Sequence, residues 1–196
     1  CLLRPVWLLS MMAERKKING VIQLMNKKLR FILVLSFILC FSGSSYCEEP
    51  EVKKEYWRNG NLKSETHYKD GEIEGLETWF YRTGEKLEET YWKNGKQSGL
   101  VVSWNKNGRK KYETNWMNGK LEGLGKWWYK NGRKKSVKHY KKGFLDGMVT
   151  EWYSSSKKKS TSHYKNGKEH GFRKEWDRNG KLTFQGNFVD GNEEIK

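Results

Sequence analysis

Hydrophobic and polar residues alternate along most of this chain in short runs, and a glycine closes each run. The segment Leu76–Gly99 contains one alternating run, a turn at 82–84, a second alternating run and a turn at 93–95. Alternation with a period of two indicates β-strands, because successive side chains of a strand point to opposite faces of the sheet. We therefore predict antiparallel hairpins, with two strands in each such segment.

The glycines recur with a period of 24 residues, from residue 52 almost to the C-terminus. Three columns begin at Gly60, Gly71 and Gly75, and Ser156 stands in the first column where glycine is expected. A fixed period of 20–50 residues indicates an array of one supersecondary unit, in which neighbouring units bury each other's surface. The predicted fold is all-β: an elongated single-layer antiparallel β-hairpin repeat array of six 24-residue units.

Asn-Gly and Asp-Gly dipeptides between alternating runs are strong hairpin signals, because both residues tolerate positive φ. Ten occur in the repeats, and each predicts a turn: Asn59-Gly60, Asp70-Gly71, Asn94-Gly95, Asn107-Gly108, Asn118-Gly119, Asn131-Gly132, Asp146-Gly147, Asn166-Gly167, Asn179-Gly180 and Asp190-Gly191.

Three columns carry most of the apolar side chains. They are Tyr56, Phe80, Trp104, Trp128, Trp152 and Trp176; Tyr68, Trp92, Trp116, Tyr140, Tyr164 and Phe188; and Val52, Leu76, Leu100, Leu124, Met148 and Phe172. The columns share one face only if the turn preserves strand parity. A three-residue loop at 82–84, which pairs Tyr81 with Glu85, does so. We therefore predict type I turns closed by a glycine bulge, with all three columns on one face.

The composition supports a folded repeat region after an export signal. Mean hydropathy is −0.97, but 14% of residues are aromatic, and nine of the ten tryptophans lie within 57–176. Residues 25–47 have the basic, apolar and small-residue order of a signal peptide, and the apolar run 31–41 is too short to span a bilayer. We predict an upstream extension at 1–24, a signal peptide at 25–47, a linker at 48–51 and the repeat domain at 52–196.

This organisation predicts an exported protein, located in the periplasm, in the cell envelope or outside the cell. An uncleaved, membrane-anchored N-terminus and lipid attachment at Cys40 or Cys47 are the alternatives. All three cysteines precede the repeats, so the array has no disulfide and no catalytic thiol. The formal net charge is +16, and 32 of the 39 basic and 22 of the 23 acidic side chains lie from Glu48 onward, which is net +10. A basic protein is attracted to anionic surfaces.

The repeated motif resembles the MORN repeat in its bacterial variant form. A representative match is Trp128-Tyr129-Lys130-Asn131-Gly132, followed by Tyr140-Lys141-Lys142-Gly143 and Asp146-Gly147. The resemblance implies an array of β-hairpins that contacts proteins or membrane lipids, with no catalytic residues to transfer. Similar bacterial proteins are often labelled antitoxin-like. The fifth unit departs from the motif at 154–156.

No arrangement in the sequence predicts catalysis. His67, His139 and His163 share one column but lie two strands or more apart, too far for a shared metal ion. Carboxylates alternate with lysines, and no phosphate-binding glycine loop opens a helix. We therefore expect a protein that is not an enzyme and has no cofactor, no metal site and no nucleic acid ligand.

The predicted function is a binding platform for a protein or an anionic envelope partner, such as lipid or cell-wall polymer. An antitoxin or immunity-type protein that neutralises a toxin by direct binding is the alternative. Exposed aromatic residues with nearby basic clusters carry the prediction, since both mark interaction surfaces. The candidate binding residues are Trp79, Tyr81, Trp127, Tyr129 and Tyr153, with Arg133, Lys134 and Lys135 steering the partner. Self-association through the open sheet edges is a further expectation.

Overall fold

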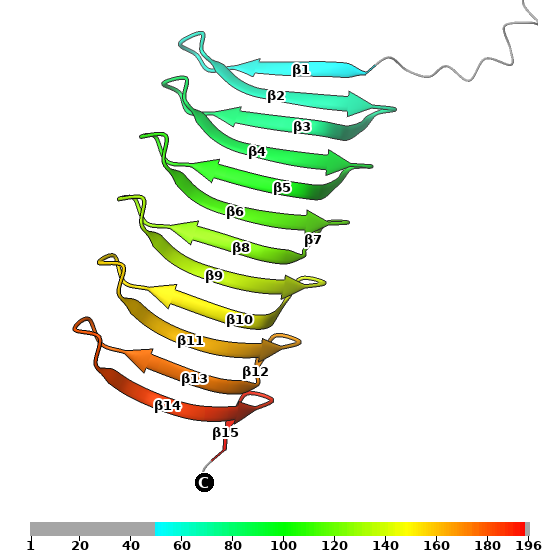
Figure 1. The fold of residues 1–196 in the computed structure, drawn as a ribbon. Helices are drawn as coiled ribbons and strands as arrows, with labels where there is room; N and C mark the ends of the chain where they lie inside the picture. The colour runs from blue at the N-terminus through cyan, green and yellow to red at the C-terminus, as the bar shows by residue number, and fades with distance from the viewer. Residues whose placement is uncertain (1–49, 195–196) are drawn as a thin grey trace, which may run out of the picture. The chain divides into compact units, whose positions relative to one another are not determined.

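The repeat domain is one continuous antiparallel sheet. The computed structural model describes residues 50–194; the predicted signal peptide at 25–47 and the extension at 1–24 lie outside them. Fifteen strands follow each other in chain order, and the described residues contain no helix (Figure 1). No described helix could therefore cross a membrane. The predicted all-β array of hairpins is confirmed.

The strands occupy nearly all of the described chain. They are β1 (Glu51–Tyr56), β2 (Leu62–Lys69), β3 (Glu72–Phe80), β4 (Lys86–Lys93), β5 (Lys96–Trp104), β6 (Lys110–Met117), β7 (Lys120–Leu121), β8 (Gly123–Trp128), β9 (Lys134–Lys141), β10 (Phe144–Trp152), β11 (Lys158–Lys165), β12 (Lys168–Glu169), β13 (Gly171–Trp176), β14 (Leu182–Val189) and β15 (Asn192–Glu193). Strands β7 and β8 together occupy one strand position of the sheet and are separated by Glu122, directly before a glycine of the third column; β12 and β13 are separated by His170 in the same way.

The first turn of each unit is the predicted three-residue loop. Between β3 and β4, the N–H of Gly84 donates to the carbonyl of Tyr81 (2.9 Å), and the N–H of Tyr81 donates to the carbonyl of Glu85 (2.8 Å). Gly84 has a φ of +100°, whereas the two residues before it have no positive φ. A type I turn followed by a left-handed glycine has these features, so this prediction is confirmed.

The second turn of each unit has two residues. In the turn between β4 and β5, Asn94 and Gly95 have φ values of +49° and +66°, and the flanking Lys93 and Lys96 pair directly. Two consecutive residues with positive φ define a type I′ turn, whose twist matches that of the flanking strands.

The third glycine column lies within strands and makes bulges rather than turns. In β10, Gly147 has a φ of +113°, and the register with β9 shifts between Leu145 and Val149. The turn before it lies at Lys142-Gly143. The prediction of a turn at Asp146-Gly147 was therefore wrong, because the dipeptide here satisfies a bulge that also needs glycine.

A further irregularity beside the three-residue loop separates the apolar columns. Phe80 pairs with Lys86 but Trp79 pairs with Glu88, so β4 has one extra residue, Leu87. Leu76 consequently faces the same way as Tyr91, and Trp92 lies on the opposite side of the sheet. Because a shift of one residue reverses every side chain, the prediction of a common face for the three columns was wrong.

The two faces of the sheet differ in how well they are covered. We call the face that carries the column Tyr68, Trp92, Trp116, Tyr140, Tyr164 and Phe188 the packed face. The opposite face, with the columns that begin at Tyr56 and Val52, is the open face. By strand register, ten of the twelve buried non-glycine side chains among the described residues lie on the packed face. Most of these ten are serines and threonines, so larger neighbouring side chains must shield them.

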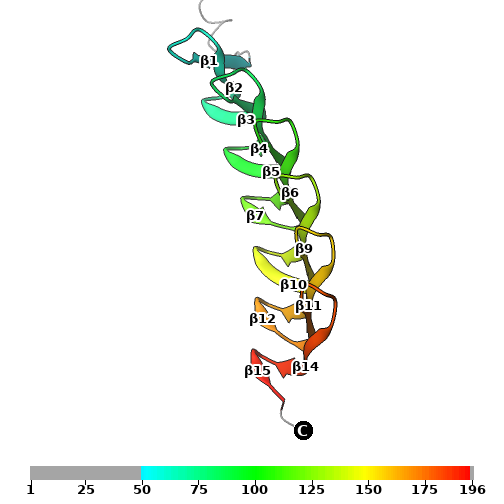
Figure 2. The ribbon, with the colours of Figure 1, turned by 90° about the vertical axis from the view of Figure 1, so that its left-hand side faces the viewer.

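Hydrogen bonds between turns link successive units along both edges of the array. The N–H of Gly143 donates to the carbonyl of Leu121 (2.8 Å) at the two-residue turns. At the three-residue turns, Nδ2 of Asn131 and Nη1 of Arg133 donate to the carbonyl of Ser154 (3.3 and 3.0 Å). The hairpins consequently stack in a single layer with their turns in line (Figure 2).

Replacing Ser156 with glycine is expected to stabilise the protein by about 1 kcal/mol. Ser156 makes the same turn hydrogen bonds as the glycines of its column, but at a φ of +74°. A side chain in this left-handed region costs about 1–2 kcal/mol. The midpoint of urea unfolding should therefore rise in Ser156→Gly. The adjacent Ser155→Gly is the control, because its φ is not positive; a rise of the same size there would show that strain is not the cause.

Candidate functional site

The open face carries every large hydrophobic side chain that is exposed among residues 50–194. Ten such side chains are exposed, and strand register assigns all of them to this face: Val52, Tyr56, Tyr91, Leu100, Met117, Phe144, Met148, Phe172, Leu182 and Val189. Phe172 is 61% exposed. Exposed apolar side chains that gather on one face mark an interaction site more often than scattered residues do, so this face is the candidate site.

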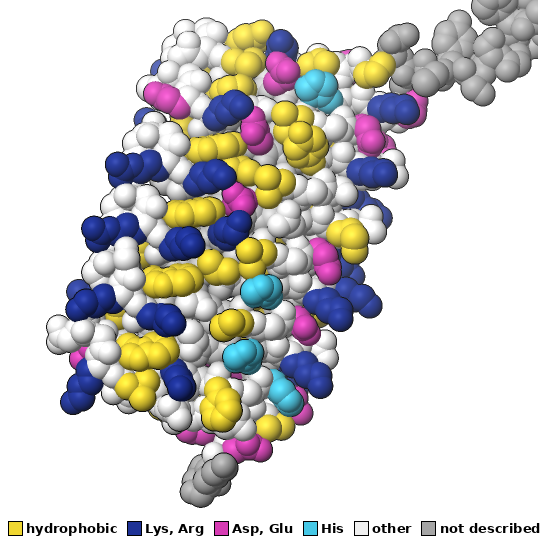
Figure 3. Space-filling model, viewed as in Figure 1, with side chains coloured by type: hydrophobic (Ala, Val, Ile, Leu, Met, Phe, Trp, Pro, Cys, Tyr) yellow, Lys and Arg dark blue, Asp and Glu magenta, His cyan; other side chains and the backbone are white. Residues whose placement is uncertain are grey.

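Aromatic residues and lysines alternate along one side of the open face. The cross-strand pairs are Phe80 with Lys86, Trp104 with Lys110, Trp128 with Lys134 and Trp152 with Lys158. Lysines also reach the ring of the next unit: Nζ of Lys110 lies 5.9 Å from the Trp128 ring centre, and Nζ of Lys158 lies 5.6 Å from that of Trp176. Figure 3 shows this face, with hydrophobic and basic side chains interleaved in a column.

The apolar column from Val52 to Phe172 runs parallel to the aromatic column, and a trough lies between the two. Phe172 and Trp176 lie four residues apart on β13, so their Cα atoms are about 13 Å apart. Lys174 lies between them. A hollow of about 520 Å³ occupies this place, and its lining comprises Lys158, Thr161, His163, Phe172, Lys174, Trp176 and Gln185. We call the space between the two columns the trough; the aromatic column and the Val52–Phe172 column are its walls.

The charge of the trough changes along the array. In its N-terminal half, lysines are paired with carboxylates: Lys86 bonds Glu89, and Glu113 accepts bonds from Lys110 (2.6 Å) and Lys126 (3.1 Å). The hydrogen bond from Lys110 lowers the pKa of Glu113, and Lys126 adds to the effect. This half is therefore close to neutral.

The C-terminal half of the trough has lysines without acidic partners. Val137 and Thr161 occupy the positions that Glu89 and Glu113 hold in the earlier units. Within the described residues, Lys134, Lys158 and Lys174 form no ion pair, and the trough floor from β9 to β14 contains no carboxylate. This half is consequently an exposed, basic and apolar surface.

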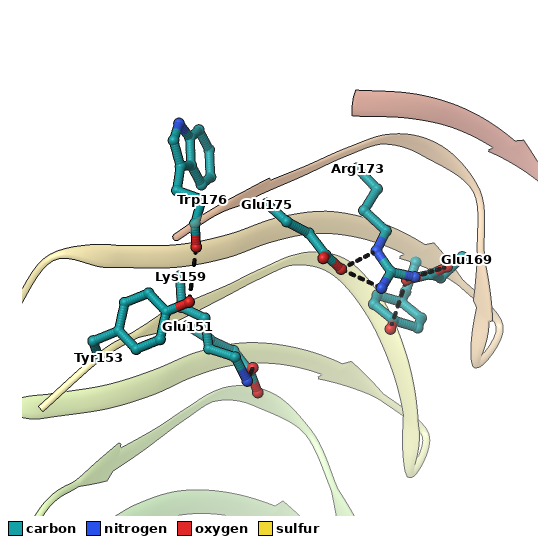
Figure 4. Close-up of polar contacts among 8 residues, drawn as sticks. Glu151, Tyr153, Lys159, Glu169, Arg173, Glu175 and Trp176 are labelled. Carbon is teal, nitrogen blue, oxygen red and sulfur yellow. Dashed lines mark hydrogen bonds and ion pairs between the residues drawn. The ribbon is translucent and has the colours of Figure 1, made fainter. Parts of the chain in front are cut away.

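The packed face also has a hollow, of about 460 Å³, in which most of the charged side chains are paired with each other. The guanidinium of Arg173 binds Glu175 and lies 3.2 Å from Glu169, which also accepts a bond from the Tyr164 hydroxyl at 3.2 Å (Figure 4). The hydrogen bond to Glu175 raises the pKa of Arg173. Because most of its charged groups are already paired, this hollow has little to offer a charged ligand.

The tryptophans predicted to bind a partner lie on the packed face. Trp127 covers Gly125, where an added Cβ would lie 2.6 Å from the indole, and Nζ of Lys138 is 5.5 Å from its ring centre. Trp79 pairs with Ser64, and Lys63 lies over its ring. These contacts give both indoles a place in the packing of this face.

The predicted tyrosines lie at the three-residue turns and bond to the next unit. The hydroxyls of Tyr81, Tyr129 and Tyr153 donate to the carbonyls of Trp104, Trp152 and Trp176, at 2.8, 2.7 and 2.8 Å. The structure thus divides the five predicted aromatic residues between the packed face and one edge of the sheet. Their recurrence in the sequence reflects contacts between units.

The predicted basic cluster points in three directions. Arg133 bonds the next turn, Lys134 pairs with Trp128 on the open face, and Nζ of Lys135 lies 5.9 Å from the Tyr129 ring centre. Only Lys134 therefore belongs to the trough. The predicted binding residues did not include Phe172, Met148 or Lys174. Their 24-residue columns would have assigned them to the open face if the extra residue of each hairpin had been recognised.

The histidines on the sheet bond to backbone carbonyls at the glycine bulges. Nδ1 of His139 lies 2.8 Å from the carbonyl of Met148, and Nδ1 of His163 lies 3.4 Å from that of Phe172. Asn115 makes the equivalent bond to Leu124 (3.1 Å). Among the residues with described positions, no three His, Cys, Asp or Glu side chains are grouped for a metal ion.

Comparison with known proteins identifies the repeat. The family described as MORN repeat variant matches five segments, at residues 52–70, 73–95, 121–142, 145–166 and 169–190, which together make up more than half of the chain. No curated protein matches the sequence. The unmatched segment between the second and third matches has the same hairpin, with Gly108 donating to Asn105 (2.9 Å). This chain belongs to the MORN repeat variant family.

Proposed function

We propose that this protein is an exported, non-enzymatic binding platform that holds another macromolecule against the open face of its sheet. The partner is a protein or an anionic component of the cell envelope. The exposure of ten large hydrophobic side chains on one face carries this proposal, because water-exposed apolar surface is stabilised by a partner that covers it.

Two further observations support the proposal. MORN repeats are generally protein- or lipid-binding repeats, and the family is typically non-enzymatic. The lysines of the C-terminal half add positive charge beside the apolar walls, which favours an anionic partner and accelerates its association. Export is inferred from the signal-like order of residues 25–47. An intact mass that matches a chain starting at Glu48, in protein isolated from the source cells, would support it. Recovery of the chain with 25–47 retained, in the cytosolic fraction, would contradict it.

Replacing Met148 and Phe172 together with aspartate is expected to abolish partner capture. Both side chains are exposed in the wall of the trough, at 45% and 61%, so the change introduces charge at the proposed contact and leaves buried packing intact. The measurement is recovery of partners on the immobilised protein from envelope and soluble fractions of the source cells, at low and high salt. Salt should release contacts that depend on exposed charge.

The matched control is Met117→Asp with Val189→Asp. These residues are exposed on the same face, but lie beside the two-residue turns and outside the trough. The control should retain the partner. Equal capture by both double variants would overturn the proposed function, whereas equal loss would show that net charge, and not the trough, decides binding.

An antitoxin or immunity-type protein would use the same surface to mask a toxin. Its trough would cover one defined protein, so capture would be limited to a single species that resists high salt. A toxin encoded beside this protein would favour this alternative.

A further inference from the structure

The trough is wide enough for one face of an α-helix to lie in it. Its walls are about 13 Å apart between Cα atoms on one strand, and the Cα atoms of an α-helix lie on a cylinder of about 2.3 Å radius, so side chains from one face of a helix can reach both walls. Resting on the proposed binding function, we propose that the partner is a protein that places an acidic amphipathic α-helix in the C-terminal half of the trough, across β9–β14.

The period of the array also fits a helix that runs across the strands. Equivalent positions of successive units lie two strands apart, or about 9–10 Å. Seven residues of α-helix advance about 10.5 Å, so side chains at i and i+7 meet equivalent positions of neighbouring units. An extended peptide repeats its side chains about every 6.6–6.8 Å, and its same-facing side chains would fall out of step with the units.

The walls provide the apolar contacts of such a helix. Met148 and Phe172 expose their side chains in one wall, and Trp152 and Trp176 lie opposite on the same two strands. The floor between them carries the smaller Thr150 on β10 and the Lys174 stem on β13, and the hollow described above lies at the β11–β14 end of this floor. Helix-in-groove recognition uses apolar anchors at i, i+3, i+4 and i+7 in this way.

The lysines of the trough determine which charge the partner helix must carry. Lys134 and Lys158 lie one unit apart beside the aromatic wall, and Lys174 lies in the floor; none has an ion-pair partner among the described residues. Glutamates or aspartates at i and i+7, flanking the apolar stripe, would meet Lys134 and Lys158. A basic helix would meet like charges there, so charge complementarity favours an acidic helix over a basic one.

The length of the basic surface sets the length of the helix. The four strand spacings from β9 to β14 (β9, β10, β11, β13, β14) span about 19 Å, which corresponds to about 13 residues of helix. Beyond β9, towards the N-terminus, the carboxylates Glu113 and Glu89 lie in the floor. They would repel acidic side chains of a longer helix, so the site ends there.

The test uses three synthetic 18-residue peptides labelled with fluorescein. The first has leucines on one helical stripe and glutamates at i and i+7 beside it, the second has lysines in place of those glutamates, and the third is the acidic peptide with a central proline. Fluorescence anisotropy with the full chain measures the dissociation constants. We expect the acidic helix to bind about tenfold more tightly than either other peptide, since proline interrupts a helix.

Charge reversal locates the site. Lys134→Glu with Lys158→Glu should weaken the acidic peptide about tenfold or more. The matched control, Lys141→Glu with Lys165→Glu, has the same net charge and the same 24-residue separation, but these lysines are exposed beside the two-residue turns. It should change the affinity less than about twofold at moderate salt.

Several results would overturn the inference: failure of the acidic peptide to bind, equal binding of the basic or proline-containing peptide, or equal effects of the two lysine pairs. Tight binding of phosphatidylglycerol vesicles without peptide binding would assign the surface to a membrane. If Met148→Asp with Phe172→Asp loses the cellular partner while the acidic peptide does not bind, the proposed function stands and the helix is excluded. If that variant keeps its cellular partner, the proposed function itself fails.

Discussion

Replacing Trp92 with alanine is expected to cost about 3 kcal/mol of folding stability. Trp92 belongs to the aromatic column of the packed face, beside Thr90, which is 2% exposed, and its Nε1 donates to Glu77 at 2.9 Å. Truncation of a packed tryptophan typically costs about 3–5 kcal/mol, because it removes apolar contacts and leaves a cavity. The lower end of this range applies because Trp92 is only partly buried.

The same truncation on the open face should have little effect on stability. Phe172→Ala removes a side chain that is 61% exposed, and surface substitutions usually change stability by less than about 0.5 kcal/mol. Urea unfolding followed by circular dichroism, with amide hydrogen exchange to resolve individual units, measures both variants. Similar losses for Trp92→Ala and Phe172→Ala would show that the faces do not differ in the way the burial pattern indicates.

Gly147→Ala is expected to destabilise the protein by about 2 kcal/mol. Gly147 has a φ of +113°, outside the left-handed region that other residues tolerate, and such strain costs about 1–3 kcal/mol. An added Cβ would also lie 3.1 Å from Cβ of His139, so the two strands would have to separate locally.

A second glycine separates strain from crowding. Gly108 has a φ of +74°, and nothing lies within 4 Å of an added Cβ. Gly108→Ala should therefore cost about 1 kcal/mol, from backbone strain alone. Equal losses of unfolding free energy in Gly147→Ala and Gly108→Ala would show that the contact with His139 has no part in the effect.

The periodicity and the turn chemistry of the sequence were sufficient to predict the hairpins, their length and the three-residue loop. Glycine, asparagine and aspartate at fixed spacing determine local φ values, and these are local properties. The faces were predicted wrongly because the extra residue at Leu87 has no characteristic residue type. One unpaired residue reverses the face to which the following side chains of the strand point. The two columns of the open face were therefore predicted to share a face with the packed aromatic column.

The positions of the candidate binding residues were harder to predict for a related reason. An aromatic residue beside a turn has the same sequence pattern whether it meets a partner or the next unit. Tyr129 proved to donate to the carbonyl of Trp152, which is a contact between units. Lys134 and Lys135 are neighbours in the sequence, yet only Lys134 reaches the trough. Exposure on each face distinguished these cases, and exposure depends on the assembled sheet.

The bulge and the turns recur at the same place in each hairpin, and this has a consequence for how such a protein can change in evolution. A duplication or loss of 24 residues within the array restores each register, because the next unit presents the same bulge, the same two turns and the same faces. Insertions of other lengths would put walls and packed columns out of line. The number of units, and with it the length of the trough, can therefore change in single genetic steps without a new fold having to be found.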